Sequence, residues 1–370
     1  MTQTAMPSVR FISPAVLPGT DLIGQTAALE AELEVPHAST IAELPARGHY
    51  STALGRAVAQ LQELHGELTS YGWRLTSRPG LDQQRAVQGL RGDIDAVADI
   101  RGDRISAGSA TADLSFRALG PLSAAAGIAL PSGEKALIDH GARRDLGDSL
   151  AAGVRETMRH LRRSCEPERL HLIIEEPQYA AVLGGSVPTV SGYRSIRAIP
   201  REEARTLITS LITAAREGGA DEVYLDPGGP LTATLIEDHA GPRSAGSQTA
   251  EGAETIDGFV LDRLDADYRH WELVGAQAEA GLQFLLPVLQ PAETAGMPEQ
   301  GFPEVTQITA RVTRPWQGIG MSLRSLGSLS LTTHGLHHRE GLRQATPAQA
   351  MATITRVRDA AEALTEQLNQ

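Results

Sequence analysis

Several side chains that can bind a metal or carry a proton stand at the ends of apolar runs in the sequence. Tyr224 and Asp226 close the run EVYLD, Asp262 closes GFVLD, and His334 follows LSLTT. Oxygen and imidazole ligands of this kind suit zinc, manganese or iron(II). The pattern predicts a metal site built from Asp226, Asp262 and His334, with Tyr224 as a fourth ligand. The alternative is that these acids only face solvent and bind no metal.

Two adjacent acids, Glu175 and Glu176, end a further apolar run, HLIIEE, directly before Pro177. Neighbouring residues of a strand point to opposite faces of a sheet. One carboxylate is therefore expected to face the candidate site. The other is expected to bond a neighbouring strand end or a helix start. A simple solvated turn is the alternative interpretation of the pair.

The histidines of HGLHHREG allow a second metal hypothesis. His334, His337 and His338 have the spacing of one helical face, which would bring three imidazoles together. We favour the interpretation in which His334 ends the last strand and the other two lie on a loop or helix start. Cys165 is the only cysteine, so the chain has no internal disulfide, and we expect this thiol to be structural or incidental.

Strand and helix patterns alternate along the whole chain. Strand-like runs occur at residues 10–15, 71–76, 113–119, 171–176, 222–226, 258–262, 283–289 and 328–333. Helical apolar spacing occurs at residues 51–68, 145–163, 202–219, 270–281 and 346–368. About eight such units predict an α/β fold, a TIM-like (β/α)8 barrel, whose chemistry belongs at the C-terminal ends of the strands. A doubly wound open sheet is the alternative, although no glycine-rich phosphate motif follows the first strand.

The domain organisation follows from the same pattern. Residues 1–370 are expected to form one barrel domain. The Gly/Pro-rich stretches at residues 240–255 and 290–304 are expected to be mobile loop insertions.

The bulk composition excludes two classes of partner. The formal net charge is -12 and the pI is about 5.4, which argues against nucleic acid and anionic membrane surfaces. No apolar run is long enough to span a bilayer, and the first residues lack the features of a signal peptide. We therefore expect a soluble cytoplasmic protein.

Five segments, in order, carry a resemblance to a known family. They are ELPARG (43–48), GWRL (72–75), GPLSAAAGIALPSGEKAL (120–137), EEPQYAAVLGGSVPTVSGY (175–193) and THGL (333–336). Together they resemble the catalytic barrel of cobalamin-independent methionine synthases, most closely the short forms with a single barrel. The resemblance implies methyl transfer from methyltetrahydrofolate to the thiol of homocysteine, which zinc holds as a thiolate in that family.

The resemblance also assigns roles to individual residues. It implies zinc-site positions for Tyr224, Asp226 and His334, where the family has His and two Cys, and for Asp262, which matches the family's acidic ligand. Both thiolate ligands are therefore replaced, and a harder divalent metal site is the expectation. Among the remaining segments, Glu175 or Glu176 would hold the amino group of the substrate, and Ser191 would lie near it.

Three functions follow as hypotheses. The first is a methionine synthase-like enzyme with weak or altered S-methyl transfer to homocysteine or a related thiol. The second is a non-catalytic barrel that acts as a binding or interaction module. The third is a metal-dependent hydrolase or lyase that activates water at the oxygen-rich site.

Overall fold

The computed structural model describes residues 7–241, 254–264, 267–289, 293, 302–336 and 341–369. Most of the two predicted loop insertions, at residues 240–255 and 290–304, lies outside these ranges. His337 and His338 also lie outside them, so the three-histidine hypothesis is not addressed by the structure.

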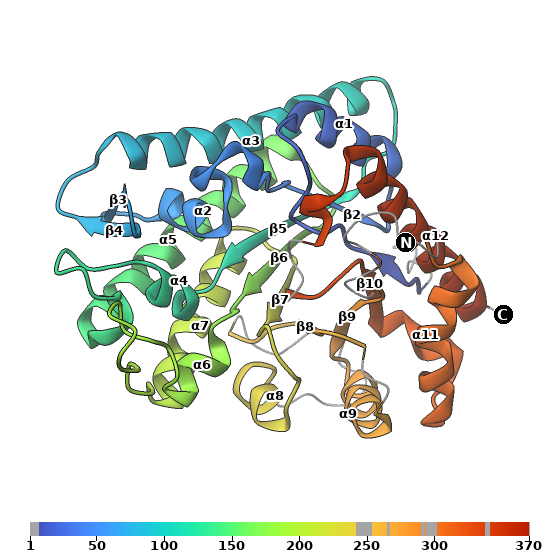
Figure 1. The fold of residues 1–370 in the computed structure, drawn as a ribbon. Helices are drawn as coiled ribbons and strands as arrows, with labels where there is room; N and C mark the ends of the chain where they lie inside the picture. The colour runs from blue at the N-terminus through green and yellow to red at the C-terminus, as the bar shows by residue number, and fades with distance from the viewer. Residues whose placement is uncertain are drawn as a thin grey trace.

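Eight parallel strands form the centre of the molecule (Figure 1). Around the sheet they are β1 (Arg10–Phe11), β10 (Leu329–Thr332), β9 (Gln283–Pro287), β8 (Gly258–Val260), β7 (Glu222–Asp226), β6 (Leu170–Glu175), β5 (Asp113–Leu119) and β2 (Ala38–Thr40). The two outer strands also meet, because Ile12 bridges Ala38 in parallel and the amide of Ser13 donates to the Ala38 carbonyl at 2.9 Å. The sheet therefore closes on itself, and the predicted (β/α)8 barrel is confirmed.

The predicted second barrel strand, at residues 71–76, is wrong. That segment is β4 (Gly72–Thr76), which pairs with β3 (His65–Thr69) in a separate antiparallel hairpin. The barrel position belongs to β2, whose three residues AST are too short to give a strand pattern in the sequence. The helix predicted over residues 51–68 is also shorter than expected. It ends at Gln60, and the last residues of the predicted range belong to β3, the first strand of the hairpin.

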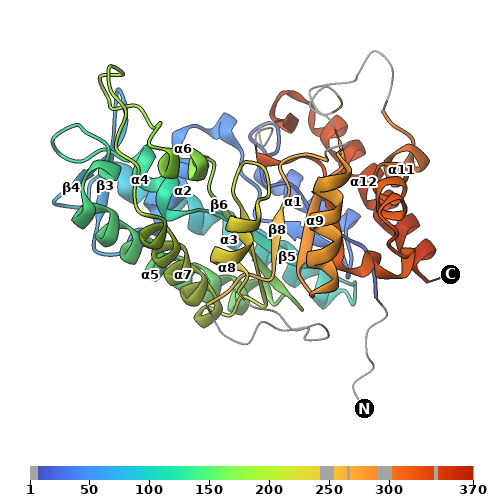
Figure 2. The ribbon, with the colours of Figure 1, turned by 90° about the horizontal axis from the view of Figure 1, so that it is seen from below.

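Helices surround the barrel, and Figures 1 and 2 show them as its outer layer. They are α1 (Leu22–Glu32), α2 (Ala53–Gln60), α3 (Leu81–Ser106), α4 (Pro121–Gly127), α5 (His140–Cys165), α6 (Tyr179–Gly184), α7 (Arg201–Glu217), α8 (Ala233–His239), α9 (Tyr268–Glu279), α11 (Val305–Gly318) and α12 (Pro347–Leu368). The last helix begins with a reciprocal cap between Thr346 and Gln349 and has Pro347 in its first turn. None of the described helices is long and apolar enough to cross a membrane.

The barrel interior is layered. Six side chains fill its middle and form an apolar cluster of their own: Ile12, Ala38, Ile173, Tyr224, Val260 and Leu285. Since side chains alternate along a strand, residues two positions away from these also face inward. The layer beyond them toward the C-terminal strand ends contains Glu175 and Asp226, and the opposite layer contains His171 and Glu222. Arg117, the register partner of Ile173, reaches Glu175 with its guanidinium.

The layer at the amino-terminal end is a polar network centred on Glu222. The guanidinium of Arg10 donates to Glu222 at 2.9 Å and to the Tyr224 hydroxyl at 2.8 Å. Tyr224 in turn donates to Glu222 at 2.8 Å, and His171 Nδ1 lies 3.1 Å from the same carboxylate. Burial opposes the charge on Glu222, but His171 and Arg10 outweigh it and lower the pKa of that carboxyl. These contacts fix the base of the barrel.

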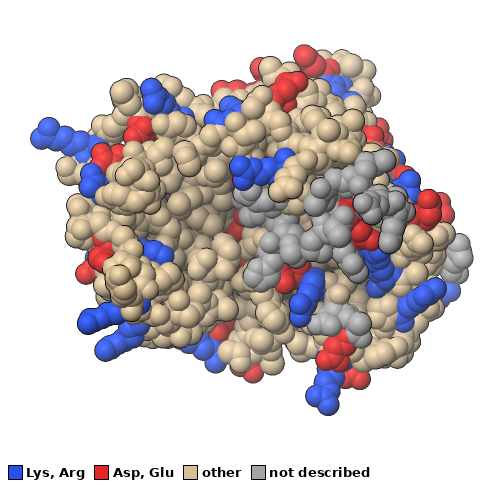
Figure 3. Space-filling model, in the orientation of Figure 1, with Lys and Arg blue, Asp and Glu red and all other residues tan. Residues whose placement is uncertain are grey.

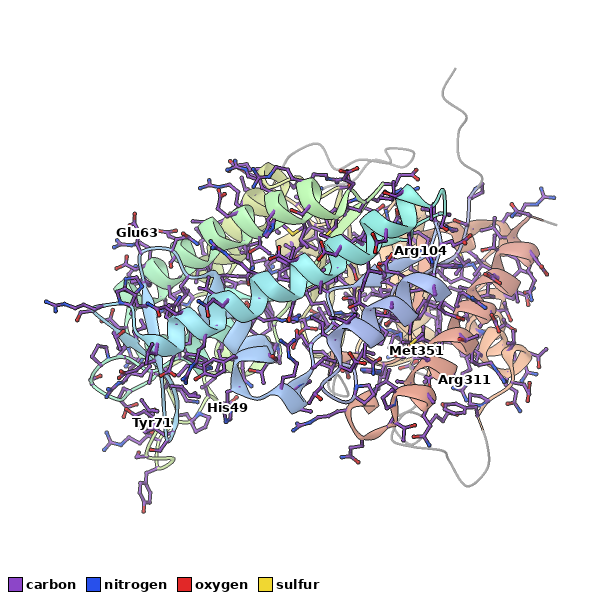
Figure 4. All side chains as sticks on the ribbon, turned by 90° about the horizontal axis from the view of Figure 1, so that it is seen from above. His49, Glu63, Tyr71, Arg104, Arg311 and Met351 are labelled. Carbon is purple, nitrogen blue, oxygen red and sulfur yellow. The ribbon has the colours of Figure 1, made fainter. Side chains whose placement is uncertain are left out.

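Close packing of α5 on the barrel depends on one glycine. A Cβ built at Gly153 would lie 1.5 Å from the carbonyl oxygen of Gln60, the last residue of α2. Figure 4 shows the long helix α3 beside α5 on the same side of the molecule. Any side chain at position 153 would therefore force α2 and α5 apart.

We predict that Gly153→Ala destabilises the protein by about 2 kcal/mol or more, because overpacking displaces backbone rather than a flexible side chain. The measurement is the free energy of unfolding in urea. Gly102→Ala is the matched control, since Gly102 lies inside α3 with no atom within 4 Å of an added Cβ. That control should be neutral or gain roughly 0.5–1 kcal/mol from helix propensity. Equal effects of the two changes would contradict the packing argument.

Candidate active site at the barrel mouth

The C-terminal ends of β5, β6, β7, β8 and β10 bring several ionisable side chains to one end of the barrel. Figure 1 looks onto this end, and Figure 2 shows it in profile with α6 toward the top. Glu175 and Asp226 are direct partners across β6 and β7. Their inward-facing carboxyl groups are consequently neighbours. We call this end of the barrel the mouth.

Arg117 of β5 brings a positive charge to the mouth. Its Nη1 lies 3.3 Å from Glu175 Oε1, and both side chains are buried. Its Nε is also buried and has no hydrogen-bond partner among the described residues. The guanidinium therefore offsets one carboxylate and keeps donors that the described residues do not use.

Asp226 is the most perturbed acid of the mouth. Its side chain is fully buried, and Oδ1 accepts from the amide of Gly228 at 3.2 Å. Oδ2 is buried without a hydrogen-bond partner among the described residues. Burial raises the pKa of Asp226 to about 8, the charge of Glu175 adds to the shift, and Arg117 opposes it. Asp226 is therefore mostly protonated at neutral pH and exchanges its proton in the range in which thiols also titrate.

Glu176 has a structural role. Its carboxylate accepts from the amides of Leu122 at 2.9 Å and Ser123 at 2.8 Å, and from the Ser123 hydroxyl at 2.6 Å. These are the first-turn donors of α4, so Glu176 acts as a cap supplied from another element. These three donors occupy both oxygens of the Glu176 carboxylate, so the group is bound to the start of α4 rather than to a substrate. The expectation that one acid faces the site and the other bonds a helix start is met, with Glu175 facing the mouth.

Two other predicted site residues lie away from this group. The Tyr224 hydroxyl binds Arg10, Glu222 and Gln283 at the amino-terminal end of the barrel. Tyr224 is therefore not a ligand alongside Asp226, and that prediction was wrong. Tyr224 precedes Asp226 by two residues and faces inward like it. Its ring lies in the central apolar layer, however, and its hydroxyl points to the amino-terminal end of the barrel. Ser191 is exposed in the loop after α6, and its hydroxyl lies 3.1 Å from that of Thr189.

The backbone after His334 packs closely against the backbone of Asp262. A Cβ at Gly335 would lie 2.1 Å from the carbonyl oxygen of Asp262, so only glycine permits this approach of the two strand ends. His334 is buried, and its Nδ1 lies 2.7 Å from the Thr333 hydroxyl. Asp262 is half-buried, and its charge contributes to the raised pKa of Asp226.

The predicted metal site does not fit the described side chains. In the part of the chain that the structure describes, no three His, Cys, Asp or Glu side chains are placed to hold one metal ion. Asp226, Asp262 and His334 share the mouth without forming such a group. No step of the chemistry proposed for the mouth is assigned to a metal.

Two cavities border Glu175. The first lies in the mouth and is lined by Val16, Arg117, His334 and Leu336, among others; its volume of about 10 Å³ is too small for a substrate. The second is a cleft of about 440 Å³ beside the mouth, between α2, α4 and the loop after β6. Glu175 thus borders the cleft with a buried side chain, and Asp226, its partner across β6 and β7, lies next to it.

Arg117 was missed in the sequence. It belongs to the strand DLSFRAL, in which all seven residues are buried. A charged side chain inside a buried strand needs a partner of opposite charge. The arginine in this apolar strand was therefore the signal in the sequence that could have identified Arg117 as a site residue. Cys165, expected to be structural, is buried at the end of α5, and burial raises the pKa of its thiol to about 12.

Fold and site together define a (β/α)8-barrel protein with an acidic mouth. No protein-family model and no curated protein matches the chain. Among solved structures, it is similar to a B12-independent methionine synthase from Shewanella bound to selenomethionine, with 10% identity, a TM-score of 0.46, and coverage of 84% of this chain and 78% of that one. It is also similar to a protein from Anabaena variabilis described as a sugar phosphate isomerase/epimerase, with 11% identity, a TM-score of 0.40, and coverage of 80% and 86%. At these values neither likeness selects a family or an activity.

The raised pKa of Asp226 predicts a pH-dependent effect of Asp226→Asn on stability. A carboxyl whose pKa is higher in the folded protein contributes stability at low pH, and this is lost as the pH rises from about 4 to about 8. Each tenfold difference in acidity between the folded and unfolded states corresponds to about 1.4 kcal/mol. The asparagine variant does not undergo this loss. The difference in free energy of unfolding, variant minus parent, should therefore increase between pH 4 and pH 8.5.

The control for that prediction is Asp82→Asn. A hydrogen bond from Tyr50 lowers the pKa of Asp82, so this variant should lose stability relative to the parent as the pH rises to about 4, and the difference should stay constant above that pH. Urea unfolding at several pH values measures both. The same pH trend in the two variants would contradict the assigned environment of Asp226.

Proposed function

We propose that the protein is an enzyme that uses the barrel mouth for acid–base chemistry on a small substrate, with Asp226 as the proton acceptor. The observation that carries the proposal is the buried Asp226 Oδ2, which has no hydrogen-bond partner among the described residues. A buried carboxyl oxygen without a partner costs about 1–3 kcal/mol. Asp226 combines such an oxygen with a strongly raised pKa at a barrel mouth, which is typical of a functional site.

The electrostatics of the mouth suit this role. Glu175 and Asp262 disfavour a third negative charge, which makes the Asp226 carboxylate a stronger base than an exposed aspartate. Arg117 limits the shift, so the pKa stays in the range that proton transfer at neutral pH requires. A substrate ammonium group placed near Glu175 would further stabilise the ionised form.

Within this class of reaction, we propose S-methyl transfer to homocysteine or a related thiol, with methyltetrahydrofolate as the donor. Support comes from the ordered sequence segments that resemble methionine synthases and from the match between a carboxyl pKa of about 8 and that of a free thiol, about 8.5. The thiol proton would pass to Asp226 while the sulfur attacks the methyl carbon. The bond from that carbon to the donor nitrogen breaks, and the nitrogen keeps the electron pair. The nitrogen then takes up the proton held by Asp226, which returns Asp226 to the carboxylate. Glu175 would hold the substrate ammonium group.

This proposal differs from the zinc chemistry that the resemblance implies. Asp226 stands where that family has a thiolate ligand, and here it would act on the thiol by removing its proton. The harder metal site suggested by the sequence is not formed by the described side chains, and the metal-dependent hydrolase or lyase hypothesis depends on that site. The non-catalytic hypothesis predicts that the protein produces no methylated thiol, whereas the proposed enzyme predicts turnover.

We predict that Asp226→Asn lowers kcat for methyl transfer by about 10²-fold or more, the usual contribution of a general base. The assay uses methyltetrahydrofolate and homocysteine under reducing conditions. In the parent, kcat should rise with pH through about 8, because the carboxylate is the active form. Glu175→Gln should mainly raise KM for the thiol, since the amide cannot pair with an ammonium group.

Asp103→Asn is the matched control, because Asp103 is exposed near the C-terminal end of α3. It should leave kcat and KM unchanged. Full activity of Asp226→Asn would overturn the assignment of the proton acceptor. A parent protein that produces no methylated thiol would overturn the methyl-transfer proposal.

A further inference from the structure

The cleft beside the mouth contains the only lysine of the chain. Every other basic side chain apart from histidine is an arginine, and Lys135 follows α4 in the segment SGEK. Lys135 is half-buried and lines the cleft. It forms no ion pair or hydrogen bond through its ammonium group with the described residues. A cation in a cleft without a counter-ion is a place where an anion can bind.

The rest of the cleft is mostly apolar. Its walls include Leu54 of α2, Leu119 at the end of β5, Pro177 after β6 and Pro188. Figure 3 looks onto this face of the protein and shows a hollowed surface in its left-central part, bordered mainly by uncharged residues. The volume of about 440 Å³ lies in the range of small-molecule sites.

The acidic side chains at the inner side of the cleft do not neutralise the positive charge of Lys135. Glu175 lines the cleft there, but Arg117 lies 3.3 Å from its carboxylate and offsets it. Glu176 is enclosed by the start of α4 and is not exposed. The accessible charge of the cleft is therefore positive on balance, in a protein whose formal net charge is -12.

We propose that this cleft is a binding site for an organic anion with an apolar ring body, whose anionic group pairs with Lys135. The rings would lie against Leu54, Leu119 and the two prolines. The site does not depend on the reaction proposed for Asp226. It adds a second group of residues that bind a ligand at the same end of the barrel.

The test uses two dyes that share one ring system. 8-Anilino-1-naphthalenesulfonate carries a sulfonate, and N-phenyl-1-naphthylamine is its neutral counterpart. The anionic dye should bind the parent at one site per chain, and Lys135→Gln should weaken that binding roughly five-fold. The neutral dye should bind both proteins equally. Leu54→Gln should weaken both dyes, because it removes apolar contact while leaving the charge.

Arg324→Gln is the control for a loss of charge, because Arg324 is exposed before β10 at the opposite end of the barrel. It should not affect either dye. Unchanged affinity of the anionic dye for Lys135→Gln, or an equal loss for the neutral dye, would overturn the proposal.

A second measurement uses the single lysine. An amine-acetylating reagent can modify only Lys135 and the α-amino group, so peptide mass spectrometry reports Lys135 directly, with the α-amino group as an internal reference. The anionic dye should slow acetylation of Lys135 at concentrations that saturate the site and leave the reference rate unchanged. An unchanged Lys135 rate at saturation would place the dye elsewhere and overturn the proposal.

Discussion

The apolar layer at the centre of the barrel is the constraint on which the rest of the structure depends. Ile12, Ala38, Ile173, Tyr224, Val260 and Leu285 fill the middle and leave no room for a charge there. Because strand side chains alternate, ionisable residues two positions on either side must still face inward. The fold thus confines them to two separate groups, one at each end of the barrel.

The two groups differ in how their charges are balanced. At the amino-terminal end, Arg10 and His171 surround Glu222, and the pKa of that acid is lowered. At the mouth, Arg117 lies 3.3 Å from Glu175, and the pKa of Asp226 is raised to about 8. Buried acids with strongly raised pKa values are typical of sites that act on a ligand. The raised pKa of Asp226, rather than a missing hydrogen bond, separates the mouth from the other end, because Asp113 Oδ2 there is also buried without a hydrogen-bond partner among the described residues. This contrast within one barrel is the basis for placing the chemistry at the mouth.

The sequence predicted the barrel and most of its strands, because long buried strands and amphipathic helices leave clear periodic patterns. It also placed Glu175, Asp226, Asp262 and His334 at strand ends. It could not show the direction in which Tyr224 points, because only the register with Arg10 and Gln283 determines that its hydroxyl reaches the other end. Nor could it identify β2, whose pairing with β5 depends on a distant segment rather than on its three residues.

The same limit explains Glu176 and Arg117. The role of Glu176 depends on the start of α4, which lies 54 residues earlier in the chain than the carboxylate that caps it. Arg117 becomes part of the site only because β5 and β6 are neighbours in the barrel. Contacts between distant segments, rather than local propensity, determine which charges are satisfied.

The most direct test of this account is the ionisation of Asp226 itself. Carbon-13 NMR of aspartate carboxyl groups, with Asp226→Asn to assign the signal, measures the pKa in the folded protein. The account predicts a midpoint near 8. A midpoint near 4 would mean that Asp226 is solvated or paired like an ordinary surface acid, and it would contradict the proposal that the mouth holds a proton acceptor.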